Sequence, residues 1–145
     1  MMTDKVYKAF CLAVRAHDGQ YDKGGSPYIL HPVAVASQVS GEEEKILALL
    51  HDTVEDTDVT NEEVREQFGN VIADALDCLT HRDGESYGEY LSRVMTNNLA
   101  ITVKLADLHN NMDLSRIKNP TEKDRKRLEK YKAAESRLMK FKKAI

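Results

Sequence analysis

The segment LLHDTVEDT, residues 49–57, ends an apolar stretch with one histidine and three acidic residues. It places His51 beside Asp52, and an imidazole nitrogen together with a carboxylate oxygen is a donor pair that divalent metal ions accept. Neighbouring residues on a helix point about 100° apart, so both side chains can reach one ion only if the ion lies across the end of the helix. Such an ion would need further ligands from other elements.

Two other polar residues stand at comparable places in apolar helices. His31 lies in PYILHP near the start of a predicted helix, and Asp107 ends the apolar run ITVKLAD. Burying an unpaired polar group costs free energy, so we expect several such groups to meet one another. The predicted metal ligands are therefore His31, His51, Asp52 and Asp107. Separate capping and salt-bridge roles are the alternative on spacing alone.

A second acidic pair follows the first. Glu55 lies four residues after His51, and Asp56 lies four residues after Asp52. If the helix continued for one turn, both carboxylates would stand on the same side as the first pair. Carboxylates beside a metal site can orient a water molecule and transfer its proton. The alternative for the segment alone is an acidic, solvated loop.

The elements that must position these residues are predicted to be helices. Residues 3–18 carry apolar side chains at helical spacing, and the glycine-rich DGQYDKGGSP ends that pattern. Thr60 with Glu63, and then Asn70, are expected helix caps. Further helices are expected over 28–39, 42–52, 60–68, 70–79, 87–95, 99–108 and 121–145. No long stretch alternates with a period of two, so we predict one all-α, compact helical-bundle domain over residues 1–145.

Charge is divided unevenly along the chain. Residues 118–145 hold 11 Lys or Arg and 4 Asp or Glu, whereas residues 1–117 hold 10 and 20. The acidic body argues against nucleic acid as a partner, and a polyanionic substrate would need a cation to receive it. The apolar stripe of the last helix is expected to pack on the core, with a homo-oligomer seam as the alternative. That stripe is Tyr131, Ala134, Leu138, Phe141 and Ile145.

The remaining features concern location and isolated side chains. The sequence has no apolar run long enough to span a bilayer and no signal-peptide pattern at its start, which predicts a cytoplasmic protein without a membrane partner. Cys11 and Cys78 stand alone and are expected to be reduced thiols. His17, on the inner face of the first helix, is expected to be a hydrogen-bonded core residue.

Several stretches, read together, resemble the hydrolase domain of the RelA/SpoT family within the HD phosphohydrolase superfamily. The resemblance extends from about residue 9 to about residue 135, along AHDGQYDKGGSPYILHPVAVA, ALLHDTVEDTDVT, LTHRDGESYGEYLSRV and VKLADLHNNMDLSRI. It implies an all-α domain with one divalent ion, usually Mn²⁺, and it implies that Glu55 and Asp56 manage the nucleophilic water. The ligands that it implies are His31, His51, Asp52 and Asp107.

The resemblance also implies a reaction, the removal of pyrophosphate from the 3′ position of guanosine tetra- or pentaphosphate. Lys23 and Asn111 match family residues that meet the nucleotide, and Arg82, in a predicted loop, is a further candidate for phosphate contact. The chain departs from the family at Asp22, where the family has Arg. It departs again in KLADLHNNM, where Leu108 and Asn110 replace Arg and His.

Three hypotheses follow for the function. The first is a metal-dependent phosphohydrolase of a small-molecule nucleotide, with guanosine polyphosphates as the first substrate and another phosphoester, such as NADPH, as the alternative. The second is a non-catalytic module that senses a nucleotide, although pure binding would not require Glu55 and Asp56. The third is a metal-stabilised scaffold whose terminal helix recruits a partner.

Overall fold

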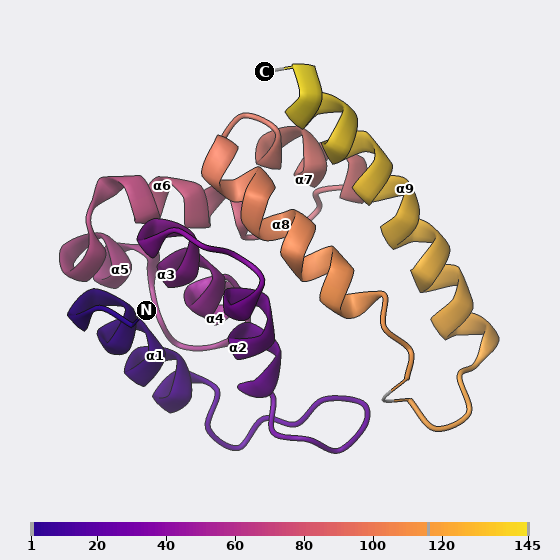
Figure 1. Ribbon diagram of the computed structural model, residues 1–145, viewed down its shortest axis with the longest axis horizontal. Coiled ribbons are helices and arrows are strands. Elements are labelled where there is room, and N and C mark those ends of the chain that lie inside the picture. Colours follow the sequence, from indigo (N-terminus) through magenta and orange to yellow (C-terminus); the bar gives the residue numbers. More distant parts are fainter. Residues whose placement is uncertain (1, 116, 145) are drawn as a thin grey trace.

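The computed structural model describes residues 2–115 and 117–144, and its regular elements within these ranges are helices. One isolated antiparallel bridge joins Tyr21 and Pro27. The predicted all-α fold is therefore confirmed (Figure 1). The helices are α1 (Asp4–Ala16), α2 (Leu30–Ser37), α3 (Glu42–Leu50), α4 (Thr53–Asp56), α5 (Asn61–Phe68), α6 (Asn70–Leu79), α7 (Tyr87–Val94), α8 (Asn98–Asn111) and α9 (Glu122–Ala144).

Helices α3 and α8 form the centre of the fold. Helix α3 contacts α1, α2, α6 and α8, while α8 contacts α2, α6, α7 and α9. Every residue from Ile46 to Leu50 is buried, which explains why this segment is apolar on all sides. His51 follows Leu50 directly, so the imidazole lies at the end of a buried helix.

The helix predicted over 42–52 is shorter in the structure. Helix α3 ends at Leu50, and the one-turn helix α4 begins at Thr53 with Asp52 as its N-cap. The buried Thr53 hydroxyl donates a hydrogen bond of 2.7 Å to the Leu50 carbonyl, and such local bonds compete with the helical ladder. The break turns the chain between His51 and the second acidic pair.

The junction of α5 and α6 corrects one predicted cap and confirms another. Gly69, with φ of 91°, is both the C-cap of α5 and the N-cap of α6, and Asn70 is the first residue of α6. The expected Asn70 cap is wrong because this left-handed φ favours glycine. The Thr60 cap is confirmed, since its side chain accepts a hydrogen bond from the Glu63 N–H.

Helix α8 continues beyond its expected end at residue 108 and reaches Asn111. Asp107 therefore lies within a helix, and Asn110 and Asn111 follow it on the same face. Asparagine has a low helix propensity, but both amides have partners here: Asn110 bonds to His31 and Asn111 to Asp107. These contacts account for the longer helix.

Helix α9 runs antiparallel to α8 along the outside of the bundle (Figure 1). Its Ala134 and Leu138 are buried and Tyr131 packs partly against the core, which confirms that the apolar stripe serves the domain itself. Phe141 is 38% exposed, so its predicted packing is wrong, and Ile145 lies outside the described residues. The helix begins at Glu122, directly after Thr121, which accepts the Asp124 N–H.

Several isolated side chains take the places that the sequence predicts. His17 is buried, and its Nδ1 lies 2.8 Å from Gln20 Oε1. Cys11 and Cys78 are free thiols. Within the described residues, no helix combines the length and the apolar character that a membrane span requires.

Candidate metal centre

Four candidate ligands converge from three parts of the chain. His31 lies in the first turn of α2, His51 and Asp52 form the junction of α3 and α4, and Asp107 lies on α8. Both histidines and Asp107 are buried, and Asp52 is partly exposed. The helices thus bring together groups that lie up to 76 residues apart in the sequence.

The donor atoms of these residues occupy a small volume. The Nε2 atom of His31 is 2.8 Å from Asp107 Oδ1 and 3.8 Å from Asp52 Oδ2. The Nε2 atom of His51 is 3.1 Å from Asp52 Oδ2 and 3.3 Å from Asp107 Oδ1. Ligand atoms about 2.1 Å from one ion would be about 3.0 Å apart at 90° and about 3.4 Å apart at the tetrahedral angle. One ligand atom each of His31, His51 and Asp52 lies within 4.8 Å of the others, which is the spacing of a possible metal site, and Asp107 Oδ1 lies beside both imidazoles.

Hydrogen bonds orient both imidazoles for this purpose. His51 Nδ1 donates to the Ala48 carbonyl at 2.6 Å, and His31 Nδ1 lies 2.7 Å from Asn110 Oδ1. A carbonyl oxygen can only accept, so each Nδ1 carries a proton and each Nε2 faces the cluster. A bound ion would take the place of any proton on Nε2 and use its lone pair. Asn110, one of the departures from the family pattern, thus has a role in holding His31.

Electrostatics keep the carboxylates ionised. Burial alone would raise the pKa of Asp107, but Lys104 and His51 hold that pKa well below its usual range. Lys104 Nζ donates to Asp107 Oδ2 at 2.9 Å, and Asn111 Nδ2 donates to Oδ1 at 3.0 Å. Burial likewise opposes the charge of Asp52, yet neighbouring His51 lowers the pKa of Asp52 to about 2. Both carboxylates are therefore available as anionic ligands.

Tyr28 is a contributor that the sequence analysis missed. Its hydroxyl donates a hydrogen bond to Asp52 Oδ2, and its pKa is raised by burial and by the nearby Asp52 carboxylate. The residue begins the YILH part of PYILHP, three positions before His31. The sign of this role in the sequence is that Tyr28 lies in the same motif as the predicted ligand His31.

The second acidic pair lies on α4. Glu55 Oε1 accepts the backbone N–H of His81 at 2.6 Å, and its side chain lines a pocket together with His51 and Asp52. Both residues are exposed, and the pKa of Asp56 is raised by partial burial and by the charges of Asp52 and Glu55. The pair thus stands beside the candidate centre with one carboxylate in the pocket wall.

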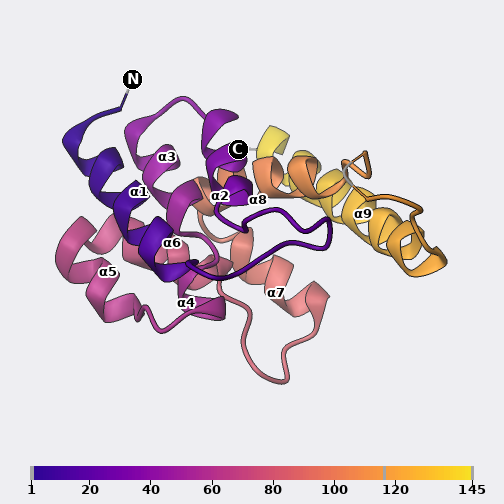
Figure 2. The same cartoon turned by 90° about the horizontal axis from the view of Figure 1, so that it is seen from below.

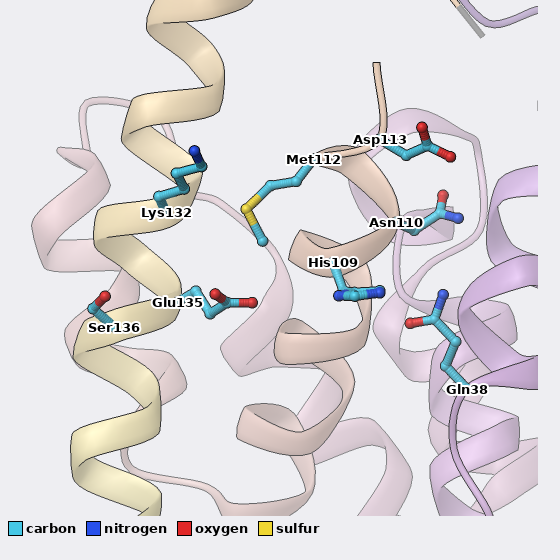
Figure 3. Close-up of a pocket in the computed structure, with 8 residues that line it drawn as sticks. All are labelled: Gln38, His109, Asn110, Met112, Asp113, Lys132, Glu135 and Ser136. Atoms are coloured by element: carbon cyan, nitrogen blue, oxygen red, sulfur yellow. The ribbon is translucent and has the colours of Figure 1, made fainter. Parts of the chain in front are cut away.

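Two pockets flank the centre, and a third lies apart from it. A pocket of about 280 Å³ adjoins His51 and Asp107 on the side of α7, and one of about 320 Å³ adjoins Tyr28 and Asn111. The third, about 690 Å³, lies between the end of α8 and α9 (Figure 3), and its described lining includes none of the four candidate ligands.

Two of the three predicted substrate contacts line a pocket beside the candidate centre, and the third does not. Lys23 and Asn111 both line the 320 Å³ pocket, which the loop between α1 and α2 borders as it extends towards α9 (Figure 2). Lys23 Nζ also lies 3.5 Å from Asp124 on α9. Arg82 is 57% exposed and pairs with Asp77 at 3.1 Å, and neither flanking pocket has it in its lining.

Asp22, which replaces the family's Arg, has a structural use in this chain. Its Oδ1 atom accepts the backbone N–H groups of Gly24 and Ser26, each at 2.9 Å. Aspartate commonly closes turns in this way, and an arginine has no acceptor to replace it. The charge reversal therefore organises the loop that carries Lys23.

A partly buried clamp holds the loop between α6 and α7, which carries His81. Arg93 donates to both carboxylate oxygens of Glu85, at 2.6 and 2.8 Å, and to the Thr80 carbonyl at 2.6 Å. Glu85 is only 11% exposed. These donors lower the pKa of Glu85 to about 2.

We expect the Glu85 carboxylate to stabilise the fold at neutral pH and to lose this effect in acid. Because its folded pKa lies below the ordinary value of about 4.3, the contribution is complete above that value and disappears as the pH falls towards the folded pKa. Denaturant unfolding of the wild type and of Glu85→Gln should show a stability difference that is constant near pH 7 and shrinks below about pH 4. Glu66→Gln, at an exposed position, serves as the control. A difference that persists unchanged to pH 2 would contradict the clamp.

Comparisons with known proteins place the chain in a family. The HD domain family model matches residues 9–87, which include His31, the His51–Asp52 pair and the second acidic pair. The guanosine-3′,5′-bis(diphosphate) 3′-pyrophosphohydrolase of Haemophilus influenzae is 34% identical over 116 residues, covering 70% of this chain and 17% of its own. The bifunctional (p)ppGpp synthase/hydrolase SpoT of Escherichia coli K12 is 34% identical over 123 residues, covering 74% and 18%. The GTP pyrophosphokinase of Streptomyces coelicolor is 33% identical over 150 residues, covering 92% and 18%.

The chain thus spans about a sixth of the length of these relatives. A solved structure, described as a metazoan ortholog of SpoT that hydrolyzes ppGpp, matches 94% of this chain and 85% of its own with a TM-score of 0.76 and 24% sequence identity. That likeness shows a common fold. Since the family match covers more than half of the residues, the chain belongs to the HD domain family.

Proposed function

We propose that this chain is a metal-dependent phosphohydrolase that removes pyrophosphate from the 3′ position of guanosine 3′,5′-bis(diphosphate). One observation carries the proposal: the Nε2 atom of each imidazole lies 2.8–3.8 Å from a carboxylate oxygen of Asp52 and of Asp107, and Glu55 lines the adjoining pocket. The Haemophilus influenzae relative, named for this reaction, supports the choice of substrate. Residues 1–145 would act as one hydrolase domain of the HD type.

The proposed cofactor is one divalent ion, Mn²⁺. It would be held by His31, His51 and Asp52, whose ligand atoms lie within 4.8 Å of one another, and by Asp107, whose Oδ1 lies beside both imidazoles. When bound, such an ion polarises a phosphoryl oxygen and makes water easier to deprotonate. Lys104 and Asn111 keep Asp107 in place for this purpose through their hydrogen bonds to its carboxylate.

The second acidic pair is assigned to proton transfer. In the reaction, a water oxygen bonds to the 3′ α-phosphorus, the bond from that phosphorus to the ribose 3′-oxygen breaks, and a proton reaches the ribose oxygen. Because Glu55 Oε1 accepts the His81 N–H, we assign its Oε2 as the atom that accepts the water proton. The raised pKa of Asp56 suits it to exchange protons beside Glu55. The products are guanosine 5′-diphosphate and pyrophosphate.

We assign the nucleoside to the 320 Å³ pocket. Lys23 and Asn111 line it, and α9 adds Arg127 and the ring of Tyr131. An aromatic ring and a guanidinium can both stack on a base. Arg82 would have to leave its ion pair with Asp77 to contact a phosphate. We propose a small-molecule nucleotide, and not a nucleic acid, as the substrate, and we propose a cytoplasmic location for the protein.

The test is to incubate the purified chain with Mn²⁺ and guanosine tetraphosphate and to follow pyrophosphate and guanosine 5′-diphosphate. We expect equal amounts of both products and loss of turnover when a chelator removes the metal. Turnover of another nucleotide, such as NADPH, with none of guanosine tetraphosphate would reject the substrate. Thermal stabilisation by nucleotide without any product would instead support the sensing module.

A further inference from the structure

The 280 Å³ pocket has two chemically different walls. One wall is the candidate metal centre itself, through His51, Asp52 and Asp107, with Glu55 beside it. The rest of the lining comes from α6, α7, α8, α9 and the loop before α7, and it contains groups that have no catalytic role in the proposed reaction. Those groups are Lys104, Lys130, Tyr87, Tyr90 and His81.

Two ammonium groups give this wall its charge. Lys104 is 12% exposed; its Nζ donates to Asp107 and lies 5.2 Å from the centre of the Tyr90 ring. Lys130 Nζ lies 4.1 Å from the centre of the Tyr87 ring, a cation–π contact that holds this long side chain at the pocket. An ammonium has three N–H donors, so both lysines can donate to a bound anion while they keep these contacts.

The Tyr87 hydroxyl is the second sign of a ligand. It is buried and has no hydrogen-bond partner among the described residues, although Tyr87 lines the pocket. A buried hydroxyl without a partner is costly and rare in folded proteins. An acceptor oxygen within the pocket would provide that partner, and a phosphate oxygen beside two ammonium groups has the required chemistry.

We propose that this pocket receives the terminal phosphate of a 3′-diphosphate, so that the chain selects a 3′-diphosphate over a 3′-monophosphate. The inference rests on the proposed function, which places the phosphorus under attack at the metal centre. The nucleoside pocket adjoins Tyr28 and Asn111, whereas the 280 Å³ pocket adjoins His51 and Asp107. A substrate that crosses the centre from the first pocket therefore extends its outer phosphate towards Lys104, Lys130 and Tyr87.

Binding of inorganic pyrophosphate and orthophosphate tests this assignment without turnover. Calorimetric titrations would use the full chain with the same Mn²⁺ concentration in both solutions. We expect Tyr87→Phe and Lys130→Met each to weaken pyrophosphate binding by about tenfold, the effect of losing one hydrogen bond to a charged group. Tyr7→Phe and Lys142→Met, both at exposed positions, are the matched controls. Tyr87→Phe removes only an unsatisfied hydroxyl and should leave the fold intact.

Kinetics provide the second readout. The ratio of kcat/KM for the 3′-diphosphate to kcat/KM for the matching 3′-monophosphate should fall by about tenfold in both variants. Unchanged pyrophosphate affinity in both variants, or a wild type that binds orthophosphate as tightly as pyrophosphate, overturns the inference. A wild type that binds pyrophosphate as expected but does not hydrolyse guanosine tetraphosphate overturns the proposed function and leaves the pyrophosphate site established.

Discussion

Replacing Asp107 with asparagine is expected to remove metal binding, to abolish turnover and to weaken the fold. The change removes an anionic ligand that lies 2.8 Å from His31 Nε2 and 3.3 Å from His51 Nε2. It also leaves the Lys104 ammonium, 12% exposed, without its carboxylate partner. Removing one member of a buried ion pair typically costs about 3–5 kcal/mol. Mn²⁺ titration and denaturant unfolding measure the two effects separately.

A double variant distinguishes the ligand role of Asp107 from its structural role. In Asp107→Asn combined with Lys104→Met, the uncompensated ammonium is gone, so part of the lost free energy of unfolding should return. Metal affinity should not return, because the anionic ligand is still missing. Wild-type Mn²⁺ affinity in Asp107→Asn would show that this carboxylate does not hold the ion.

The second large effect is expected from Glu55→Gln, which should slow turnover by about 10²–10⁴-fold, the usual range for a lost general base. The glutamine carbonyl can still accept the His81 N–H that Glu55 Oε1 now accepts, so the nearby loop should keep its place. Steady-state kinetics and Mn²⁺ titration together check this expectation, since metal affinity should be retained.

Glu62→Gln is the matched control, because Glu62 is an exposed acid on α5. Its turnover should equal that of the wild type. If Glu55→Gln turned over at the wild-type rate, proton transfer would have to be assigned elsewhere. If it instead lost the metal, Glu55 would be acting as a ligand.

The fold could be anticipated from local patterns, and the differences arise where tertiary contacts compete with them. Helical periodicity and the Thr60 cap are local signals. At the break after Leu50, the buried Thr53 hydroxyl donates to the Leu50 carbonyl. The sequence does not show that Thr53 is buried, so it does not show this hydrogen bond. The extension of α8 depends on partners for Asn110 and Asn111 that come from the tertiary structure. Propensity alone gives no sign of either.

The candidate site also combines residues that local patterns reveal with residues that only tertiary contacts reveal. The residues that carry distinctive chemistry, such as His51 and Asp52, stand out because polar groups interrupt apolar helices. Tyr28 and Lys104 look like ordinary helix residues in the sequence, and only the structure shows their hydrogen bonds to Asp52 and Asp107.

In the sequence, α9 shows a basic segment with one apolar stripe. In the structure its Arg127 and Tyr131 line one flanking pocket and its Lys130 lines the other. These cations face an acidic centre, and their charges complement it. Charge counts cannot reveal which residues of a helix turn towards a site, because that depends on how the helix docks.

Anomalous diffraction from crystals grown with Mn²⁺ tests the metal centre most directly. We predict one anomalous peak per chain at the cluster, about 2.0–2.2 Å from the Nε2 atoms of both His31 and His51. The carboxylates of Asp52 and Asp107 should complete the protein ligands of the same ion. At saturating Mn²⁺, a cluster without such a peak would contradict the assignment of a metal-dependent hydrolase.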